Sequence, residues 1–462
     1  MFGGAKIEKA FDVSVATSSQ MEQAMLLWSE MYEDRPSWKK PEDLQLTMNL
    51  PAAIASEIAR LVTLEMKSTI AGSPRADFLN EQYQRVVDKA REFTEYACAS
   101  GGVILKPYLS SDDKIMVAVV QAVDFHPVSF DSDGDVTAGI FTDYAFIGKK
   151  KYTRLEFHQY ENRTITITNK VFCLETSEIT NGQKDALGNE VPLTEVPEWE
   201  KLAPVVTIKD VDRVLFSYFK MPFANHVDPR SPLGVSTFSR ATEQIQRADA
   251  LWSEIAWEFK AGETAVHASD TLFKKDENGN VTLPEGTDRL FRTFAFDKDQ
   301  KLDTFAPDFR DTSLFNGLNQ TLHKIEFLCG LAYGTISVPT QIDKTATEVK
   351  QSRQRSFSTV SDIQKSLEKA LRNLIYSIDA MTSLYNLAPE GEYEVSFDWD
   401  DSLIVDREVE FGRLMSMVAA DMIRPEYVVA WYFGVPEEEA LEMAPSNNRE
   451  PPDKELPLVE EE

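Results

Sequence analysis

The sequence of 462 residues predicts an α+β fold. Two observations indicate it: helical patterns and strand patterns occur in separate blocks along the chain, and a short strand-rich stretch at 263–307 separates two helices of similar length. Separate blocks of helices and strands are typical of α+β proteins. At this length the chain also has enough residues for two or more domains and a sizeable core.

Helical patterns dominate the first hundred residues. One short helix is predicted at Ser18–Tyr32, a second at 50–67 with Pro51 in its first turn, and a third at about Asp77–Cys98. In each of them apolar side chains recur at three- and four-residue steps, which places them on one helix face. We therefore expect a helical N-terminal section.

After Gly101-Gly102 the pattern changes to that of β-strands. The segment 163–168 alternates apolar and polar residues, as a half-buried strand does. The aspartates at 131–135 surround Gly134 and predict a hairpin turn. A polar loop or a long hairpin is expected at 175–200, and the predicted antiparallel strands lie at 103–105, 115–123, 136–148, 151–162, 163–168 and 211–219.

Two further helices flank the strand-rich stretch 263–307. The first is predicted at Ser236–Lys260, with Ser236 as its N-cap and Gly262 as its stop, and the second at Asp311–Cys329. If these helices lie antiparallel, they form a stalk with the insert at its tip. An ordinary α+β subdomain on a helical hairpin is the alternative interpretation.

The longest helix is predicted from Thr345 to Tyr385. Thr345 followed by Glu348 is a capping-box pattern. An unbroken helix here would be about 60 Å long at about 1.5 Å per residue, so it must cross a domain, join domains or pack beside copies of itself. Its apolar stripe comprises Phe357, Val360, Ile363, Leu367, Leu371, Leu374, Ile378, Met381 and Tyr385.

The C-terminal part is predicted to be shorter and more acidic. A strand at Tyr393–Phe397 is expected to rejoin the sheet, and two helices are expected at Asp406–Ala420 and Pro425–Phe433. The last residues, 445–462, have the composition of a disordered tail.

Charge is distributed unevenly along the chain. The net charge is −28 and the pI about 4.7, which argues against a basic surface that grips nucleic acid but not against a pore through which DNA slides. Residues 390–462 hold 21 acidic and 5 basic side chains, whereas 340–372 holds seven basic and four acidic ones. A solvated helix face explains this basic segment as well as a DNA channel does.

Other compositional features exclude further classes of protein. No signal peptide is recognisable at the start, and no apolar run approaches the about 18 residues that suggest a membrane span. The three cysteines, Cys98, Cys173 and Cys329, are widely spaced and are typical of a reduced intracellular environment.

No constellation of residues predicts catalysis or a bound metal. Asp131, Asp133 and Asp135 fail the spacing of a calcium loop, so the hairpin turn is preferred. The acidic residues Asp398, Asp400 and Asp401 suggest a nuclease metal site, but no second motif supports them. Phosphate-loop and serine-nucleophile motifs are absent, and Trp252 falls on an apolar helix face rather than forming a stacking site with Trp257. The five histidines are scattered, at 126, 158, 226, 267 and 323. We therefore expect no cofactor and no enzyme activity.

The string VPTQIDKTATEVK at Val338–Lys350, together with the long helix after it, resembles the tunnel loop and tunnel helix of tailed-phage portal proteins, the head-to-tail connector family. The branch typified by the portal of the Bacillus phage SPP-one is the most similar. The resemblance extends from about Asn49 to Val435 and also covers the order of the two helices and the insert.

This resemblance implies a portal-like subunit with a mixed α/β wing, a two-helix stem, a small β-rich clip, a long tunnel helix and a short helical crown. The parts expected are the helical part of the wing at 1–100, its β-rich part at 101–233, stem helices at 234–262 and 308–332, the clip at 263–307, the tunnel loop at 333–344, the tunnel helix at 345–388, a strand returning to the wing at 389–404, the crown at 405–444 and a disordered acidic tail at 445–462.

By the same resemblance, about twelve copies would form a ring by head-to-tail contacts. The ring would occupy one capsid vertex of the virion after assembly in the host cytoplasm, and double-stranded DNA would pass through it during packaging and ejection without sequence-specific binding. Its partners would be the terminase large subunit, major capsid and scaffolding proteins, and head-completion or adaptor proteins, with no membrane involved.

The site residues implied by the resemblance belong to the tunnel loop and the tunnel helix. In the loop they are Thr335, Ile336, Ser337, Val338, Pro339, Thr340, Gln341, Ile342, Asp343 and Lys344, and in the helix Thr345, Glu348, Lys350, Arg353 and Arg355. Two alternatives are a minor capsid protein and, from another class, a metal-dependent nuclease or hydrolase.

Overall fold

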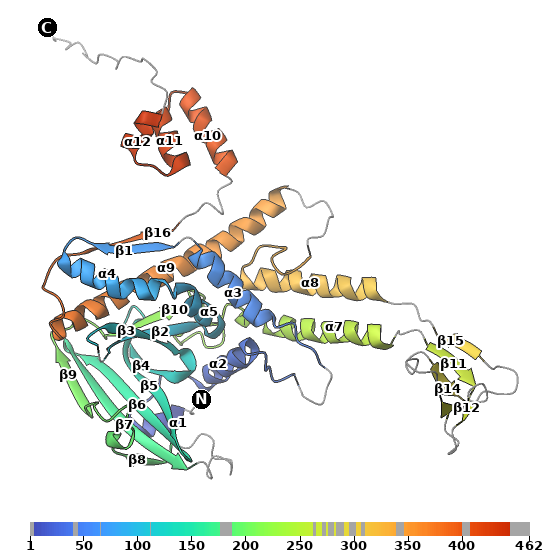
Figure 1. Ribbon diagram of the computed structural model, residues 1–462, viewed down its shortest axis with the longest axis horizontal. Helices are drawn as coiled ribbons and strands as arrows, with labels where there is room; N and C mark the ends of the chain where they lie inside the picture. The colour runs from blue at the N-terminus through green and yellow to red at the C-terminus, as the bar shows by residue number, and fades with distance from the viewer. Residues whose placement is uncertain are drawn as a thin grey trace, which may run out of the picture. The chain divides into compact units, whose positions relative to one another are not determined.

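The computed structural model of the chain contains two compact units, residues 1–399 and 400–462, and each is described by itself. Figure 1 shows its helices and strands. The structure describes residues 4–39, 45–64, 66–110, 112–175, 187–261, 265–269, 274–275, 281–282, 291–294, 302–305, 310–338, 346–399 and 407–443.

The N-terminal section is helical, as predicted. Ser18 caps the helix predicted at Ser18–Tyr32, where its hydroxyl accepts a hydrogen bond from the Met21 N–H (3.3 Å). The single helix predicted at 77–98 is instead two helices that meet at Asp88-Lys89, where neither glycine nor proline signals a break. The helices are α1 (Gly4–Phe11), α2 (Ser19–Tyr32), α3 (Leu50–Thr63), α4 (Pro74–Val87) and α5 (Ala90–Ser100).

Residue 67 was wrongly included in the second predicted helix. That helix, α3, ends at Thr63, and Lys67–Ala71 forms strand β1. β1 pairs antiparallel with β16 (Glu394–Asp398), the strand predicted at Tyr393–Phe397. The two strands form a sheet of their own rather than joining the larger sheet, because the partner of β16 comes from the helical N-terminal section.

The strands predicted between 101 and 174 are confirmed, but they divide between two antiparallel sheets. One has the order β10-β2-β3, and the other β4-β5-β6-β7-β8 with β9 also paired to β7. The prediction of a single strand at 211–219 is wrong. Strand β9 ends at Lys209, and strand β10 begins only at Ser217. The strands are β2 (Gly102–Leu109), β3 (Ile115–Gln121), β4 (Phe125–Phe130), β5 (Val136–Ile147), β6 (Lys150–Glu161), β7 (Thr164–Glu175), β8 (Asn189–Val191), β9 (Val205–Lys209) and β10 (Ser217–Lys220).

Two short turns of 3-10 helix, η1 and η2, lie between these strands, and a third, η3, precedes helix α7 (Thr242–Ala261). The turn at 131–135 is confirmed: one carboxylate oxygen of Asp131 accepts the N–H groups of Asp133 and Asp135, both at 2.9 Å. The described part of the loop predicted at 175–200 contains β8 and the buried Trp199. The 3-10 turns are η1 (Ala122–Asp124), η2 (Leu193–Glu195) and η3 (Ser239–Ala241).

The two helices predicted around the insert lie side by side and antiparallel (Figure 1). They are α7 (Thr242–Ala261) and α8 (Asp311–Cys329). The end of α7 meets the start of α8 through the ion pair of Arg310 with Glu258 (2.7 Å) and through the rings of Phe259 and Phe315.

The first of these helices begins later than predicted. Ser236 is not its N-cap, because the Ser236 hydroxyl donates to the carbonyl of Cys98 (3.2 Å) and accepts the Phe238 N–H (3.3 Å). The 3-10 turn η3 then leads into α7. The backbone before α7 is therefore bonded to the end of α5, which fixes where the helix leaves the N-terminal section.

The insert between α7 and α8 consists of short strands where the structure describes it. β11 pairs parallel with β14 and antiparallel with β15, and β12 pairs antiparallel with β13. The strands are β11 (Ala265–Ser269), β12 (Lys274–Lys275), β13 (Val281–Thr282), β14 (Phe291–Phe294) and β15 (Leu302–Phe305).

The long helix predicted after Thr345 is α9 (Ala346–Leu384), 39 residues in length. Most of its apolar stripe is buried in the largest core cluster, which α2–α5, β2, α7 and α8 also line. The buried Arg75 of α4 ties the end of α9 to the N-terminal section, since it donates to a carboxylate oxygen of Asp379 (2.7 Å) and to the Ser383 hydroxyl (2.6 Å). Helix α9 therefore crosses unit 1 as part of its hydrophobic core.

Unit 2 is a small group of helices. The predicted helices 406–420 and 425–433 are confirmed as α10 (Arg407–Ala419) and α11 (Pro425–Phe433), and a third helix, α12 (Glu437–Met443), was not predicted. The acidic tail predicted at 445–462 lies outside the described residues. None of the helices in the described ranges is long and apolar enough to cross a membrane.

Candidate functional site

The first part of the predicted loop turns back onto α8. Gly330 follows the last residue of α8 with a φ of 74°, a left-handed conformation that favours glycine. The Leu331 N–H donates to the Glu326 carbonyl (2.9 Å), as in a Schellman helix end. A side chain on Gly330 would clash with the hydroxyl of Thr359 on α9, so the end of α8 lies directly against the long helix.

A buried carboxylate organises this turn. Glu326 of α8 is fully buried, and its Oε1 accepts the backbone N–H groups of Gly334 (3.0 Å), Ile336 (2.8 Å) and Ser337 (3.0 Å). Its Oε2 accepts the hydroxyl of Ser337 (2.9 Å). Three N–H groups converging on one charged oxygen offset the cost of burying it. The same charge acts on Cys329, whose thiol pKa is raised to about 12 by burial and by Glu326.

Two more side chains of α8 hold the following residues. Asn319 bonds both backbone groups of Val338, accepting its N–H (2.9 Å) and donating to its carbonyl (3.1 Å). His323 lies with Nδ1 3.1 Å from the Ser337 hydroxyl, and its ring meets that of Tyr333 edge to face. We call residues 330–338 the loop root. Its backbone is hydrogen-bonded to Asn319 and Glu326, and its Ser337 hydroxyl contacts His323. These three side chains lie one helical turn apart along α8.

Positive charge gathers beside the loop root. The guanidinium of Arg355 on α9 lies 4.5 Å from the ring centre of Phe327 and 5.7 Å from that of Tyr333. Lys324 of α8 lies over the same Phe327 ring at 5.2 Å. The Nη1 atom of Arg355 is buried and makes no hydrogen bond within the described residues. Cation–π contacts of this kind fix the cations in place without neutralising them.

Only part of the predicted site lies within the described residues. Thr335, Ile336, Ser337 and Val338 belong to the loop root, and Arg355 is the predicted helix residue whose side chain is described. Residues 339–345 lie outside the described residues. Glu348, Lys350 and Arg353 lie on α9, but their side chains lie outside the described set.

The basic residues farther along α9 form ion pairs on its exposed face. Lys369 pairs with Asp135 of the hairpin turn (2.7 Å), Arg372 with Glu368 (2.7 Å) and Lys365 with Asp362 (3.5 Å). Exposed pairs of this kind contribute about 0–1 kcal/mol each. For this half of α9 the structure therefore favours the solvated helix face over a DNA-binding strip.

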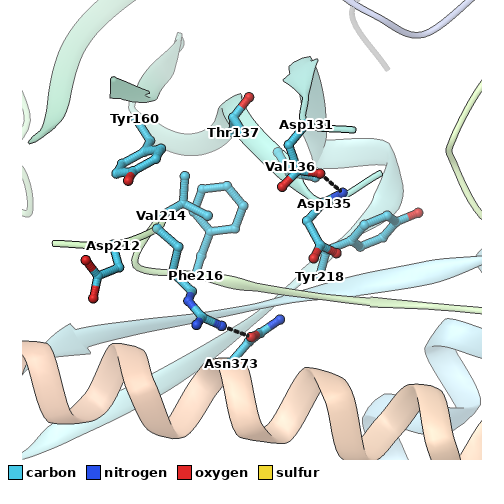
Figure 2. Close-up of a pocket in the computed structure, with 11 residues that line it drawn as sticks. Asp131, Asp135, Val136, Thr137, Tyr160, Asp212, Val214, Phe216, Tyr218 and Asn373 are labelled. Atoms are coloured by element: carbon cyan, nitrogen blue, oxygen red, sulfur yellow. Dashed lines mark hydrogen bonds between the residues drawn. The ribbon is translucent and has the colours of Figure 1, made fainter. Parts of the chain in front are cut away.

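A polar cavity lies between the hairpin turn at 131–135, the segment before β10 and α9 (Figure 2). Arg213 and Asp212, two of the charged side chains that line it, already have partners within the chain. Arg213 donates to the amide oxygen of Asn373 (2.5 Å) and stacks over Tyr376, and Asp212 pairs with Arg163 (3.1 Å). The cavity is therefore a junction that ties the sheet to α9 rather than a site prepared for a ligand.

A second buried polar cluster joins β6 of the six-stranded sheet to β2 of the three-stranded sheet. Glu156 contacts Lys106 (2.8 Å), His158 (2.6 Å) and Arg154 (3.1 Å). Although burial disfavours its charged form, the charge of Lys106, the hydrogen bond with His158 and the charge of Arg154 hold the pKa of Glu156 well below its usual value. Among the described residues, no group of three or more His, Cys, Asp and Glu side chains is arranged to hold a metal ion. The candidate nuclease residue Asp398 ends β16, and Asp400 and Asp401 lie outside the described residues.

The sequence matches a known protein family over nearly its whole length. The family model described as "Phage portal protein, SPP1 Gp6-like" covers residues 29–452. The chain belongs to this family of phage portal proteins. The match confirms the resemblance inferred from the loop string and the order of elements, and it favours a portal over the minor capsid alternative.

Solved structures similar to this portal protein come from gene transfer agent (GTA) particles. A chain in the virion of a native GTA particle is 13% identical, with 89% of this chain and 93% of that chain covered and a TM-score of 0.42. A chain in the neck of a native GTA particle, computed with C12 symmetry, is 13% identical, with 83% and 90% covered and a TM-score of 0.38. No curated protein matches the sequence.

The residues that hold the loop root of this portal protein were not predicted from its sequence. Glu326 was missed, although a signal existed: it follows Leu318 and Leu322 at four-residue steps on the buried face of α8. A charged residue on an apolar helix face requires partners when buried. Asn319 and His323 carried no comparable signal, because polar residues at partly exposed helix positions are common.

Proposed function

We propose that this portal protein is one subunit of a ring of about twelve copies, closed by head-to-tail contacts around a channel for double-stranded DNA. The observation that carries the proposal is the family match over residues 29–452. The ring would occupy one vertex of the capsid, contact capsid and scaffolding proteins, and form part of the virion.

The stem of this ring would be built from α7 and α8. Their antiparallel packing and the strand-rich insert between them support this assignment. The insert 263–307 connects the two stem helices and would form the tip of the stem. It would dock the terminase large subunit during packaging and head-completion proteins afterwards. The helices α10–α12 would form the short crown.

The tunnel loop would extend from the loop root into the channel. Supporting this, Glu326 and Asn319 fix the backbone as far as Val338, and α9 resumes the chain at Ala346. Arg355 and Lys324 place positive charge beside the root. Such charge attracts the phosphates of passing DNA, while the overall charge of −28 opposes tight binding.

Movement of the loop would reach the body through α9. The helix contacts α3, α4, β2 and β10 over its buried length. Since packed helices shift as rigid rods, displacement at its start would be transmitted to these elements.

A replacement of the loop tip tests this function. Residues Pro339–Asp343 are changed to five Gly and Ser residues, which keeps the connection between α8 and α9 but removes the side chains. We expect the variant to assemble rings of normal size and to package DNA, or retain it, several-fold less well in a packaging assay with proheads and terminase.

The matched control is the same kind of replacement at the tip of the β5–β6 hairpin, Ile147–Lys149. It should leave packaging near the level of the natural protein. Normal packaging by the Pro339–Asp343 variant would remove the loop from the mechanism.

A further inference from the structure

The small sheet formed by β1 and β16 has one protected edge. On the β1 side, Asn80 of α4 accepts the Ile70 N–H (3.1 Å), and the side-chain amide of Gln84 donates to the Ser68 carbonyl (2.8 Å). The same Gln84 amide donates to Asn80 Oδ1 (3.0 Å). Side chains of α4 thus satisfy backbone groups on the outer edge of β1, and such cover prevents pairing with another chain.

The same bonds determine which backbone groups of β16 point outward. In an antiparallel pair, residues whose backbone groups point away from the partner strand lie opposite each other. Ile70 lies opposite Val395, and Ser68 lies opposite Phe397. Since the Ile70 N–H and the Ser68 carbonyl point away from β16, the N–H and C=O groups of Val395 and Phe397 point away from β1.

The outer edge of β16 has no cover of this kind. Within the described part of the chain, no hydrogen bond is formed to the outward N–H and C=O groups of Val395 and Phe397. Figure 1 shows α4 beside β1 and β16 at the outside of the pair. An unpaired strand edge is a template to which another extended segment can add.

The exposed side of this edge is acidic. Asp398 faces Lys67 across the pair, but the glutamates near the start of β16 take part in none of the ion pairs formed within the described residues. A basic side chain on an added strand would therefore meet unpaired negative charge. Residues 388–399 contain no basic side chain and four acidic ones, all exposed: Glu390, Glu392, Glu394 and Asp398.

The other side of the edge is apolar. Val395 and Phe397 are half-buried and pack against the largest core cluster. The Phe397 ring is stacked with that of Trp399, with 6.3 Å between their centres and 6° between their planes. Successive side chains of a strand point to opposite faces. Alternate side chains of an added strand would therefore lie beside these apolar residues.

We propose that the outer edge of β16 binds an extended segment of another protein, in which basic residues alternate with apolar ones. The segment adds to the β1–β16 sheet as a third strand. Its backbone pairs with Val395 and Phe397, its basic side chains meet Glu392 and Glu394, and its apolar side chains pack beside Phe397. This docking surface is separate from the DNA channel and does not depend on the ring.

The chain itself offers poor occupants for this edge. Residues 444–462 contain six acidic and two basic side chains and four prolines. They carry the same sign of charge as the edge, and proline cannot donate to a strand ladder. Two β16 strands paired edge to edge would bring glutamates beside glutamates. Charge therefore favours a different protein as the partner.

Peptide binding to the full chain tests the proposal. The probe is a short fluorescent peptide in which Lys alternates with Val, and its affinity is measured by anisotropy. One control peptide has Glu in place of Lys. The other keeps Lys and Val but carries N-methyl groups on alternate residues, which removes N–H donors. Since a net charge of −28 attracts any basic peptide, the N-methylated control isolates strand pairing. We expect the unmodified Lys–Val peptide to bind about tenfold more tightly than either control.

A proline variant tests the same edge from the side of the protein. Val395→Pro removes an outward N–H without removing a hydrogen bond to β1, and it should weaken binding of the Lys–Val peptide about tenfold. Val395→Thr keeps the N–H and is the matched control, for which we expect affinity near that of the natural chain. Thermal unfolding of both variants checks that the body remains folded.

Hydrogen exchange of the natural chain provides a test that needs no variant. The Lys–Val peptide should slow amide exchange at Val395 and Phe397 several-fold. Binding without this protection, equal binding of either control peptide, or no binding of the Lys–Val peptide would overturn the proposal. None of these results bears on ring formation, which particle mass measures separately.

Discussion

At the scale of single residues, the loop root depends on one buried charge. Glu326 accepts three backbone N–H groups on one carboxylate oxygen, and its other oxygen accepts the Ser337 hydroxyl and lies 3.3 Å from His323 Nδ1. Both oxygens therefore take part in positioning residues 334–337. A hydrogen bond to a charged group contributes about 1.5–3 kcal/mol, roughly twice a neutral one. The carboxylate therefore determines where the proposed tunnel loop leaves α8.

Glu326→Gln is expected to loosen the loop root without unfolding the body. The neutral amide keeps an acceptor for the N–H groups but turns a donor toward the Ser337 hydroxyl and His323. We expect a loss of about 2 kcal/mol in unfolding free energy and faster amide exchange at Gly334, Ile336 and Ser337, measured by hydrogen exchange. Gln320→Ala, on the exposed side of the same helix, is the control, and unchanged exchange in the Glu326 variant would show that the carboxylate does not hold the turn.

Sequence patterns locate residues of this kind poorly. Of the residues predicted for the tunnel loop, Thr335–Val338 lie in the turn on α8. The partners of that turn lie 8 to 19 residues earlier, where helix periodicity assigns a face but not a hydrogen bond. Arg355 was assigned to the site through the resemblance, and its stacking on Phe327 and Tyr333 depends on the packing of two helices.

At the scale of elements, α8 and α9 meet where the chain leaves one for the other. Gly330 supplies both the left-handed backbone of the helix end and the space for Thr359. The end of α8 is thus fixed relative to α9 by close contact, while Glu326 fixes the loop root relative to α8.

A double-mutant cycle tests this junction. Gly330→Ala should cost about 2 kcal/mol, from backbone strain together with the clash against Thr359. Adding Thr359→Ala should recover about 1 kcal/mol, because it removes the clash and leaves the strain. Free energies of unfolding from denaturant titration measure both, and strictly additive effects would mean that the two helices do not touch there.

Elements with local signals were predicted well. The bounds of α8 and the length of α9 followed from uninterrupted apolar periodicity, and the β4–β5 hairpin from its aspartate-rich turn. Errors arose where the deciding contact is distant in sequence. β1 pairs with β16, more than 300 residues later, and Ser236 bonds to the end of α5 instead of capping a helix.

At the scale of the whole molecule, the family match and the proposed ring account for features that a single subunit leaves unexplained. Large apolar side chains of unit 2, such as Met422 and Phe433, are exposed in the single subunit. A stalk formed by two helices gains a function when many copies enclose a channel. The excess of acidic residues is compatible with a channel that repels DNA more than it binds it.

The most direct test of the central claim is electron microscopy of the purified full-length chain, together with its particle mass in solution. The account predicts closed rings of about twelve subunits with an open centre, formed by the chain alone or with scaffolding and capsid proteins. Compact single molecules that never form rings, even with those partners present, would contradict it.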